Sequence, residues 1–99
     1  MNDIAILIDK TYVIDETTGD NMSSQTERMV FCDSSSVSQS EFHAAAQTGR
    51  RPALRLKMWA SEYRDEEYAV YNDAEYYIYR TFKTKDLIEL YLERRLNDE

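Results

Sequence analysis

The sequence predicts a mainly β protein: a small antiparallel β-barrel of five to six strands, with one short α-helix inserted after the second strand. Three observations predict this class. Apolar residues recur at every second position in several stretches, which is the period of a strand with one buried face. Only one segment carries a full set of signals for the start and end of a helix. The chain has 99 residues, enough for one domain with one core, so residues 1–99 are expected to form a single unit.

The first third of the chain is predicted to form a strand, a loop and a second strand. Residues 3–14 are mostly β-branched or aromatic and predict one long strand, or two shorter ones with a bend at Asp9 and Lys10. Residues 15–27 are polar, rich in turn-forming residues and long for a hairpin loop. We expect this loop to be mobile and to become ordered only on assembly. Residues 28–33 (R-M-V-F-C-D) predict a short apolar strand.

The helix signals follow a run of serines. Ser38 and Glu41 have the spacing of a capping box, in which the Ser hydroxyl accepts the Glu N–H and the Glu carboxylate accepts the Ser N–H. Three consecutive alanines, the best helix formers, come next. Gly49 suits a left-handed helix end, and Pro52 prevents continuation. On this helix Phe42 is expected to take the core side.

The second half of the chain is dominated by period-two patterns. Residues 54–63 place leucines, Met and Ala on one side and Arg, Lys, Trp and Ser on the other, which predicts a strand with one buried face. Residues 68–71 and 76–83 flank the sequence N-D-A-E, whose Asn and Asp tolerate left-handed backbone, so a hairpin is predicted. Tyr side chains fall on both faces of this hairpin, and its outward set suits either cross-strand packing or a protein interface.

The end of the chain has two interpretations. Residues 87–92 alternate as a last strand, with a frayed tail over residues 94–99, but a helix over residues 87–96 also fits the apolar spacing. We favour the strand. The strands are expected to close into a barrel rather than form an open sandwich, because open edges rich in Tyr and Ile invite unwanted pairing.

The composition of the chain limits the classes of function and the cell compartments to consider. The net charge of −7, from 12 basic and 19 acidic residues, gives no electrostatic footprint for nucleic acid. The single Cys32 cannot form an internal disulfide and fits a reducing cytoplasm. The sequence has no basic-plus-apolar signal region, and no apolar run approaches the ~20 residues of a membrane helix, so a soluble intracellular protein is expected.

Residues able to support catalysis are few. His43 is the only histidine, which excludes a His-pair metal site, and we expect it on an exposed or interface face of the helix. A nucleophile pair of Cys32 and His43 is conceivable, but a Cys within a strand is more often a small buried hydrophobe. Asp65, Glu66 and Glu67 are interpreted as a solvated turn rather than a weak cation site. We therefore expect no enzyme activity and no cofactor.

Four segments in order carry a resemblance to a known family. They are S-V-S-Q-S-E-F-H-A-A-A-Q-T-G-R-R-P, A-L-R-L-K-M-W-A-S-E-Y, A-V-Y-N-D-A-E-Y-Y-I-Y-R-T-F and D-L-I-E-L-Y-L. Over residues 30–93 the chain resembles the head closure proteins of tailed bacteriophages, also called head–tail joining, stopper or head completion proteins. One departure is the sequence R-D-E-E at residues 64–67, where many relatives have a tight N-G hairpin.

The resemblance implies a structural virion protein, assembled in the cytoplasm of the bacterial host. It implies a small β-barrel that forms a ring, expected to be dodecameric, below the portal and adaptor proteins in the neck. The ring would close the channel on packaged DNA, pass that DNA without sequence-specific binding, and dock a tail-completion or tail-tube protein. No catalytic residues are implied.

A ring of identical subunits joins two different surfaces of each copy. We expect the segment 34–52 to face a partner or the channel, and the basic helix exit to complement the acidic turn of a neighbour. The candidate interface residues are Ser38, Gln39, Glu41, His43, Gln47, Arg50, Arg51, Asp65, Glu66 and Glu67. The alternative function is a monomeric small-barrel module that binds a peptide or a host factor.

Overall fold

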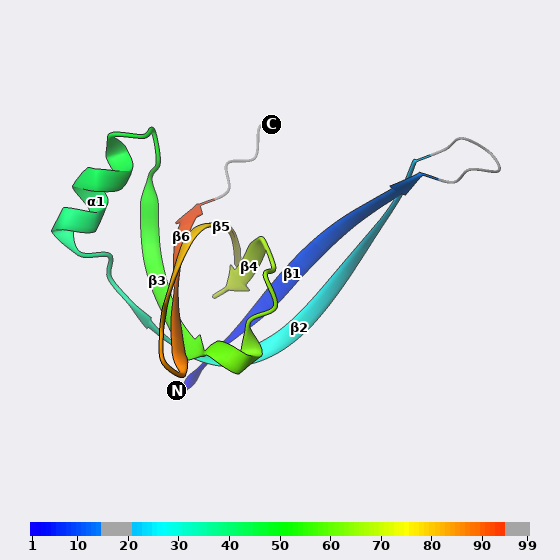
Figure 1. Cartoon of the computed structure of the whole chain (residues 1–99), viewed down its shortest axis with the longest axis horizontal. Coiled ribbons are helices and arrows are strands. Elements are labelled where there is room, and N and C mark those ends of the chain that lie inside the picture. Colours follow the sequence, from blue (N-terminus) through cyan, green and yellow to red (C-terminus); the bar gives the residue numbers. More distant parts are fainter. Residues whose placement is uncertain (15–20, 95–99) are drawn as a thin grey trace.

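The computed structural model describes residues 1–14 and 21–94, with side chains described at residues 1–10 and 25–94. Within these residues the chain forms six strands, one α-helix and one short 3-10 helix (Figure 1). In chain order they are β1 (Asp3–Ile14), β2 (Asn21–Ser35), α1 (Gln39–Ala46), β3 (Pro52–Trp59), η1 (Ala60–Glu62), β4 (Tyr68–Tyr71), β5 (Ala74–Thr84) and β6 (Leu87–Arg94).

The strands form one antiparallel sheet that closes into a barrel in the order β1-β2-β3-β6-β5-β4. The closing contact is short: residues 6–8 of β1 pair with residues 68–70 of β4. This confirms the mainly β barrel with one helix after the second strand. It also rules out the helix over residues 87–96, since β6 runs through Arg94 and pairs with both β3 and β5.

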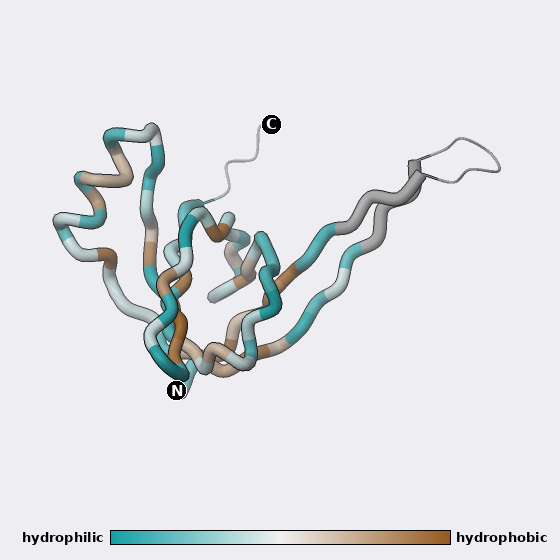
Figure 2. Tube along the Cα trace, in the orientation of Figure 1, coloured by the Kyte–Doolittle hydropathy of each residue, from teal (hydrophilic) through white to brown (hydrophobic). Residues whose placement is uncertain are grey.

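Alternate residues of each strand fill the barrel. On β3, Leu56 and Met58 are fully buried while Lys57 between them lies on the outer face, as the period-two pattern predicted. Leu90 of β6 lies directly opposite Leu56. Figure 2 shows brown apolar segments alternating with teal polar ones along the barrel strands. The buried cluster comprises Ala5, Leu7, Val30, Cys32, Leu56, Met58, Ala69, Tyr76, Ile78, Ile88, Leu90 and Leu92.

β1 and β2 continue far beyond the barrel as a two-stranded arm, which Figure 1 shows projecting from the body. Residues 9–14 pair with residues 21–26 in an unbroken register, and neither stretch pairs with a third strand. The expected loop over residues 15–27 therefore differs from the structure, because its residues 21–27 belong to β2. Residues 15–20 of that loop lie outside the described residues.

The helix begins and ends as its sequence signals predict. The Ser38 hydroxyl accepts the Glu41 N–H at 3.2 Å, and Gly49 adopts a φ of +83°, which favours glycine. Phe42, however, was expected to face the core and is instead exposed, while Ala45 is the buried residue of α1. The helix connects β2 to β3 outside the closed barrel, so its residues do not reach the barrel core.

Several strand bounds differ from the expected ones: β2 ends at Ser35 instead of residue 33, β3 starts at Pro52 instead of residue 54, and β5 covers Ala74–Thr84 instead of residues 76–83. The strand predicted over residues 54–63 ends at Trp59, because residues 60–62 turn into η1. The Ala60 N–H donates to the Asp86 carbonyl at 2.7 Å, which diverts the chain from the ladder toward the β5–β6 turn. Of the tail predicted over residues 94–99, Arg94 belongs to β6 instead, and residues 95–99 lie outside the described part.

Candidate functional site

The acidic turn between η1 and β4 is fastened to the barrel by Glu66, which is 5% exposed. Arg28 on β2 donates to Oε2 of Glu66 from Nε at 2.9 Å and from Nη2 at 2.7 Å, and the Arg64 backbone N–H donates to Oε1 at 2.8 Å. Asp65, between Arg64 and Glu66 in the chain, has a left-handed φ of +63°. The turn was expected to be solvated, and this holds for Asp65 and Glu67, which are exposed. It does not hold for Glu66, which is buried and bonded to Arg28.

A second carboxylate fastens α1 to the barrel wall. Glu41 accepts hydrogen bonds from the Tyr79 hydroxyl at 2.9 Å and from Arg80 Nη2 at 2.6 Å, both on β5. Burial raises the pKa of Glu41, but the bonds from Arg80 and Tyr79 outweigh burial and leave that pKa below its usual value. The Glu41 carboxylate therefore holds two distant segments together instead of completing the capping box.

At the exit of the helix the two arginines differ. Arg50 Nη1 donates to Glu93 Oε2 at 2.6 Å, and the Arg50 guanidinium lies 5.4 Å from the centre of the Tyr77 ring. The Arg51 backbone N–H donates to Glu93 Oε1 at 3.2 Å. The Arg51 side chain is exposed and forms no ion pair with any residue that the structure describes. Arg51 is thus more available to a partner than Arg50.

The other candidates lie on the outside of α1. Gln39, His43 and Gln47 are exposed, and His43 contacts the edge of the Phe42 ring with centroids 6.3 Å apart. The Ser38 hydroxyl is used in the cap. The structure therefore gathers these residues on one helix. Within one chain it does not join the helix exit to the acidic turn, since Arg50 pairs with Glu93 and Glu66 with Arg28.

Large apolar side chains on the outer face of β1 and β2 were not singled out from the sequence. Ile4 and Phe31 are cross-strand partners, 49% and 57% exposed, and Met29 on the same face is 63% exposed. We call Ile4, Met29 and Phe31 the outer apolar patch. The signal was present, because Met29 to Cys32 are four consecutive apolar residues, and a strand can bury only alternate ones, here Val30 and Cys32.

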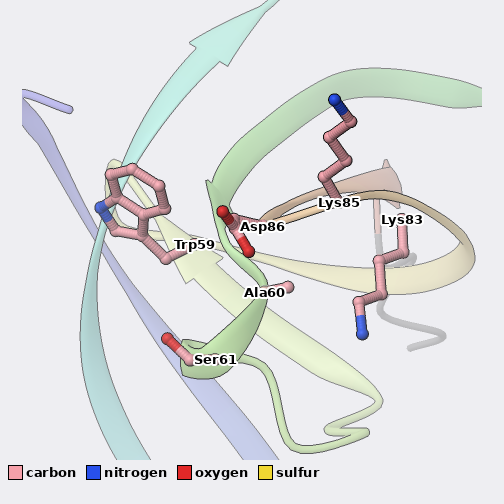
Figure 3. A pocket seen from close by; sticks show the side chains of 6 residues that line it. All are labelled: Trp59, Ala60, Ser61, Lys83, Lys85 and Asp86. Carbon is pink, nitrogen blue, oxygen red and sulfur yellow. The ribbon is translucent and has the colours of Figure 1, made fainter.

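A surface pocket of about 400 Å³ opens where η1 meets the β5–β6 turn (Figure 3). Trp59, about half exposed, lies on the side opposite Lys83, and both Lys83 and Lys85 are exposed. Within the described residues, no ion pair, hydrogen bond or ring contact engages these three side chains. We call this feature the Trp59–lysine pocket; its lining residues are Trp59, Ala60, Ser61, Lys83, Lys85 and Asp86.

The thiol and the imidazole are kept apart. Cys32 is fully buried inside the barrel, and burial, together with the charges of Asp3 and Asp33, raises the pKa of its thiol to about 11. His43 is exposed on α1.

Among the described residues no group of three His, Cys, Asp or Glu side chains could hold a metal ion. None of the helices in the described part is long and apolar enough to cross a membrane.

Comparison with models of known protein families gives no match, and comparison with curated proteins gives none either.

Proposed function

We propose that this chain is a structural subunit of the virion neck of a tailed bacteriophage, where copies of it form a ring that closes the DNA channel and joins head to tail. The proposal combines the family resemblance of residues 30–93 with a barrel whose exposed features suit assembly. It assigns no catalytic residue, metal or cofactor to the chain.

The projecting arm of β1 and β2 carries the proposal. Six residue pairs, over residues 9–14 and 21–26, extend past the strand pairing of the barrel, which at about 3.4 Å per residue is a reach of roughly 20 Å. Only near its base does the arm contact the barrel, where Lys10 pairs with Glu75 at 3.7 Å among the residues whose side chains are described. A two-stranded hairpin on its own is marginally stable in water, and its unpaired edges invite pairing with another chain. An arm of this length is therefore best explained by a surface on a neighbouring molecule that supports it.

The outer apolar patch gives a second reason. Ile4, Met29 and Phe31 place three large, exposed apolar side chains on the outer face of β1 and β2, within the barrel part of these strands. Exposed apolar patches on a protein surface often mark sites of interaction with other proteins. With the arm at one end of β1 and β2 and the patch toward the other, each copy has two dissimilar contact regions. A head-to-tail ring requires that arrangement.

The charge of the chain is compatible with a DNA channel. Proteins that grip DNA neutralise phosphates with clustered Lys and Arg, and their affinity depends on the number of such contacts. This chain has a net charge of −7, and its exposed basic residues are scattered over several elements. A ring of such subunits would let DNA pass without holding it.

The decisive experiment disrupts the gene in the phage or prophage that encodes this chain and examines the particles by electron microscopy. We expect heads separate from tails, with heads that have lost their DNA, and restoration of tailed particles by the chain supplied from a plasmid. Normal tailed particles from the disrupted genome would refute the proposed function. They would also favour the alternative of a monomeric module that binds a peptide or host factor.

A further inference from the structure

The Trp59–lysine pocket and the arm have opposite charge. In the pocket, Lys83 and Lys85 contribute two positive charges, and the Asp86 carboxylate removes one. The six residues that join the paired ends of the arm, residues 15–20, have the sequence D-E-T-T-G-D, with three acidic residues and no basic one. The pocket thus has more basic than acidic side chains, although the chain as a whole has a net charge of −7.

We infer that the Trp59–lysine pocket binds the acidic segment 15–20 of a neighbouring copy of this chain. The occupant is a second copy because the segment follows directly from Ile14, and the described arm that ends at Ile14 projects away from its own barrel (Figure 1). The arm reaches roughly 20 Å, which is close to the 25 and 30 Å widths of the molecule. An adjacent copy packed against this one therefore lies within reach of the arm.

The geometry of the pocket suits such an occupant. The hydrogen bond from the Ala60 N–H to the Asp86 carbonyl fixes η1 against the β5–β6 turn, so the pocket is formed before binding. In Figure 3 the Lys85 and Lys83 side chains extend from the turn in opposite directions, upward and downward, and the Trp59 ring lies on the side opposite Lys83. Lysine ammonium groups with no partner among the described residues can pair with carboxylates, and an exposed indole can cover the backbone of the bound segment.

This inference rests on the proposed function, since it requires neighbouring copies. It differs from the pairing of Arg50 and Arg51 with the acidic turn that the sequence suggested, because Arg50 and Glu66 already have partners within their own chain. It also predicts dependence on ionic strength, because exposed ion pairs weaken as salt screens them.

The test uses a carbodiimide, which joins a lysine amine directly to a carboxylate in contact with it. Copies of the intact chain labelled with ¹⁴N and ¹⁵N are mixed, cross-linked and digested with trypsin. We expect mixed-isotope links between Lys83 or Lys85 and an acidic residue of segment 15–20. Because the reagent captures transient contacts, a mainly monomeric sample is still informative. Absence of such mixed links, or links confined to one isotope, would overturn the inference.

Charge reversal provides the matched control. Lys83→Glu with Lys85→Glu removes the amines that react, and Asp15→Lys with Glu16→Lys removes two of the carboxylates, so either variant alone should lose most of the link for chemical reasons. The mixture of the two variants is the informative sample, because it should regain the link, with the amine now on the segment of one copy and the carboxylate in the pocket of the other. A mixture that forms no such link would overturn the inference. The pair Arg51→Glu and Arg64→Glu changes net charge equally at exposed sites. An equal loss in that control would show general repulsion and refute the specific contact.

Two further outcomes separate this inference from others. If a single-stranded oligonucleotide abolishes the mixed cross-links and binds the intact chain through Lys83 and Lys85, the pocket is a nucleic-acid site and the inference fails. If mixed links appear only between other residues, the chain still self-associates and the proposed ring stands without this contact. Normal particles after gene disruption would remove the neck function and leave the measured contact intact.

Discussion

The buried carboxylate of Glu66 yields the sharpest stability prediction. Replacing Glu66 with Ala removes the acceptor of two bonds from Arg28 and one from the Arg64 backbone N–H. Hydrogen bonds to a charged group each contribute about 1.5–3 kcal/mol to stability, net of the bonds to water that they replace. The bonds are not additive, and the Arg28 side chain is 27% exposed, so water and solvent screening recover part of the loss.

We therefore expect the free energy of unfolding to fall by about 2–4 kcal/mol in Glu66→Ala. For a domain of this size that corresponds to a decrease in Tm of roughly 10–25 °C. Urea and thermal unfolding, followed by circular dichroism, would measure both. The neighbouring exposed Glu67→Ala is the control and should change stability by less than about 0.5 kcal/mol. Equal, small effects of the two substitutions would mean that the carboxylate of Glu66 is solvated, contrary to the described geometry.

Three other predictions follow from the same structure. The free energy of unfolding should fall as pH rises from 9 toward 11, because the buried Cys32 thiol keeps its proton to about pKa 11 while the unfolded thiol releases it near 9; Cys32→Ala should flatten this decline in alkaline urea titrations. Glu41→Gln should increase amide hydrogen exchange in α1 while leaving β3 protected, because the anchor to Arg80 weakens; unchanged exchange in α1 would contradict the anchor. Leu56→Ala should cost about 2–5 kcal/mol, against less than about 0.5 kcal/mol for the exposed Phe82→Ala, and equal losses would be inconsistent with the barrel core.

Local patterns predicted the parts of the fold that depend on local rules. The alternation around Leu56 and Met58 fixed which face of β3 is buried, because a strand has a period of two. The cap at Ser38 and the left-handed Gly49 marked the ends of the only α-helix in the described residues. These signals depend on neighbours within a few residues, which the sequence displays directly.

Contacts between distant segments were not predicted. β2 was expected to start at residue 28 because residues 21–27 are polar, yet the ladder with β1 satisfies their backbone groups and extends the strand to Asn21. Phe42 was placed toward the core from its apolar character alone, although α1 lies outside the closed barrel. The side chains that bond to the carboxylates of Glu66 and Glu41 lie 38 or 39 residues away, a separation that no local spacing reveals.

For the candidate interface residues, only their exposure can be compared with the structure. The helix segment and its exit were selected for their polarity, and Gln39, His43 and Gln47 are exposed as an interface requires. The Trp59–lysine pocket was not anticipated, because it forms only when the end of β3 and the β5–β6 turn are joined through the bond from Ala60 to Asp86.

The central claim is that copies of this chain form a ring in the virion neck, with each arm supported by the next copy. Cryo-electron microscopy of the neck in particles of the phage or prophage that encodes this chain tests it most directly. The account predicts a ring of densities that the barrel fits, with the β1–β2 arm of each copy lying against its neighbour's barrel. A neck without such a ring, or a ring whose arms extend into solvent, would contradict it.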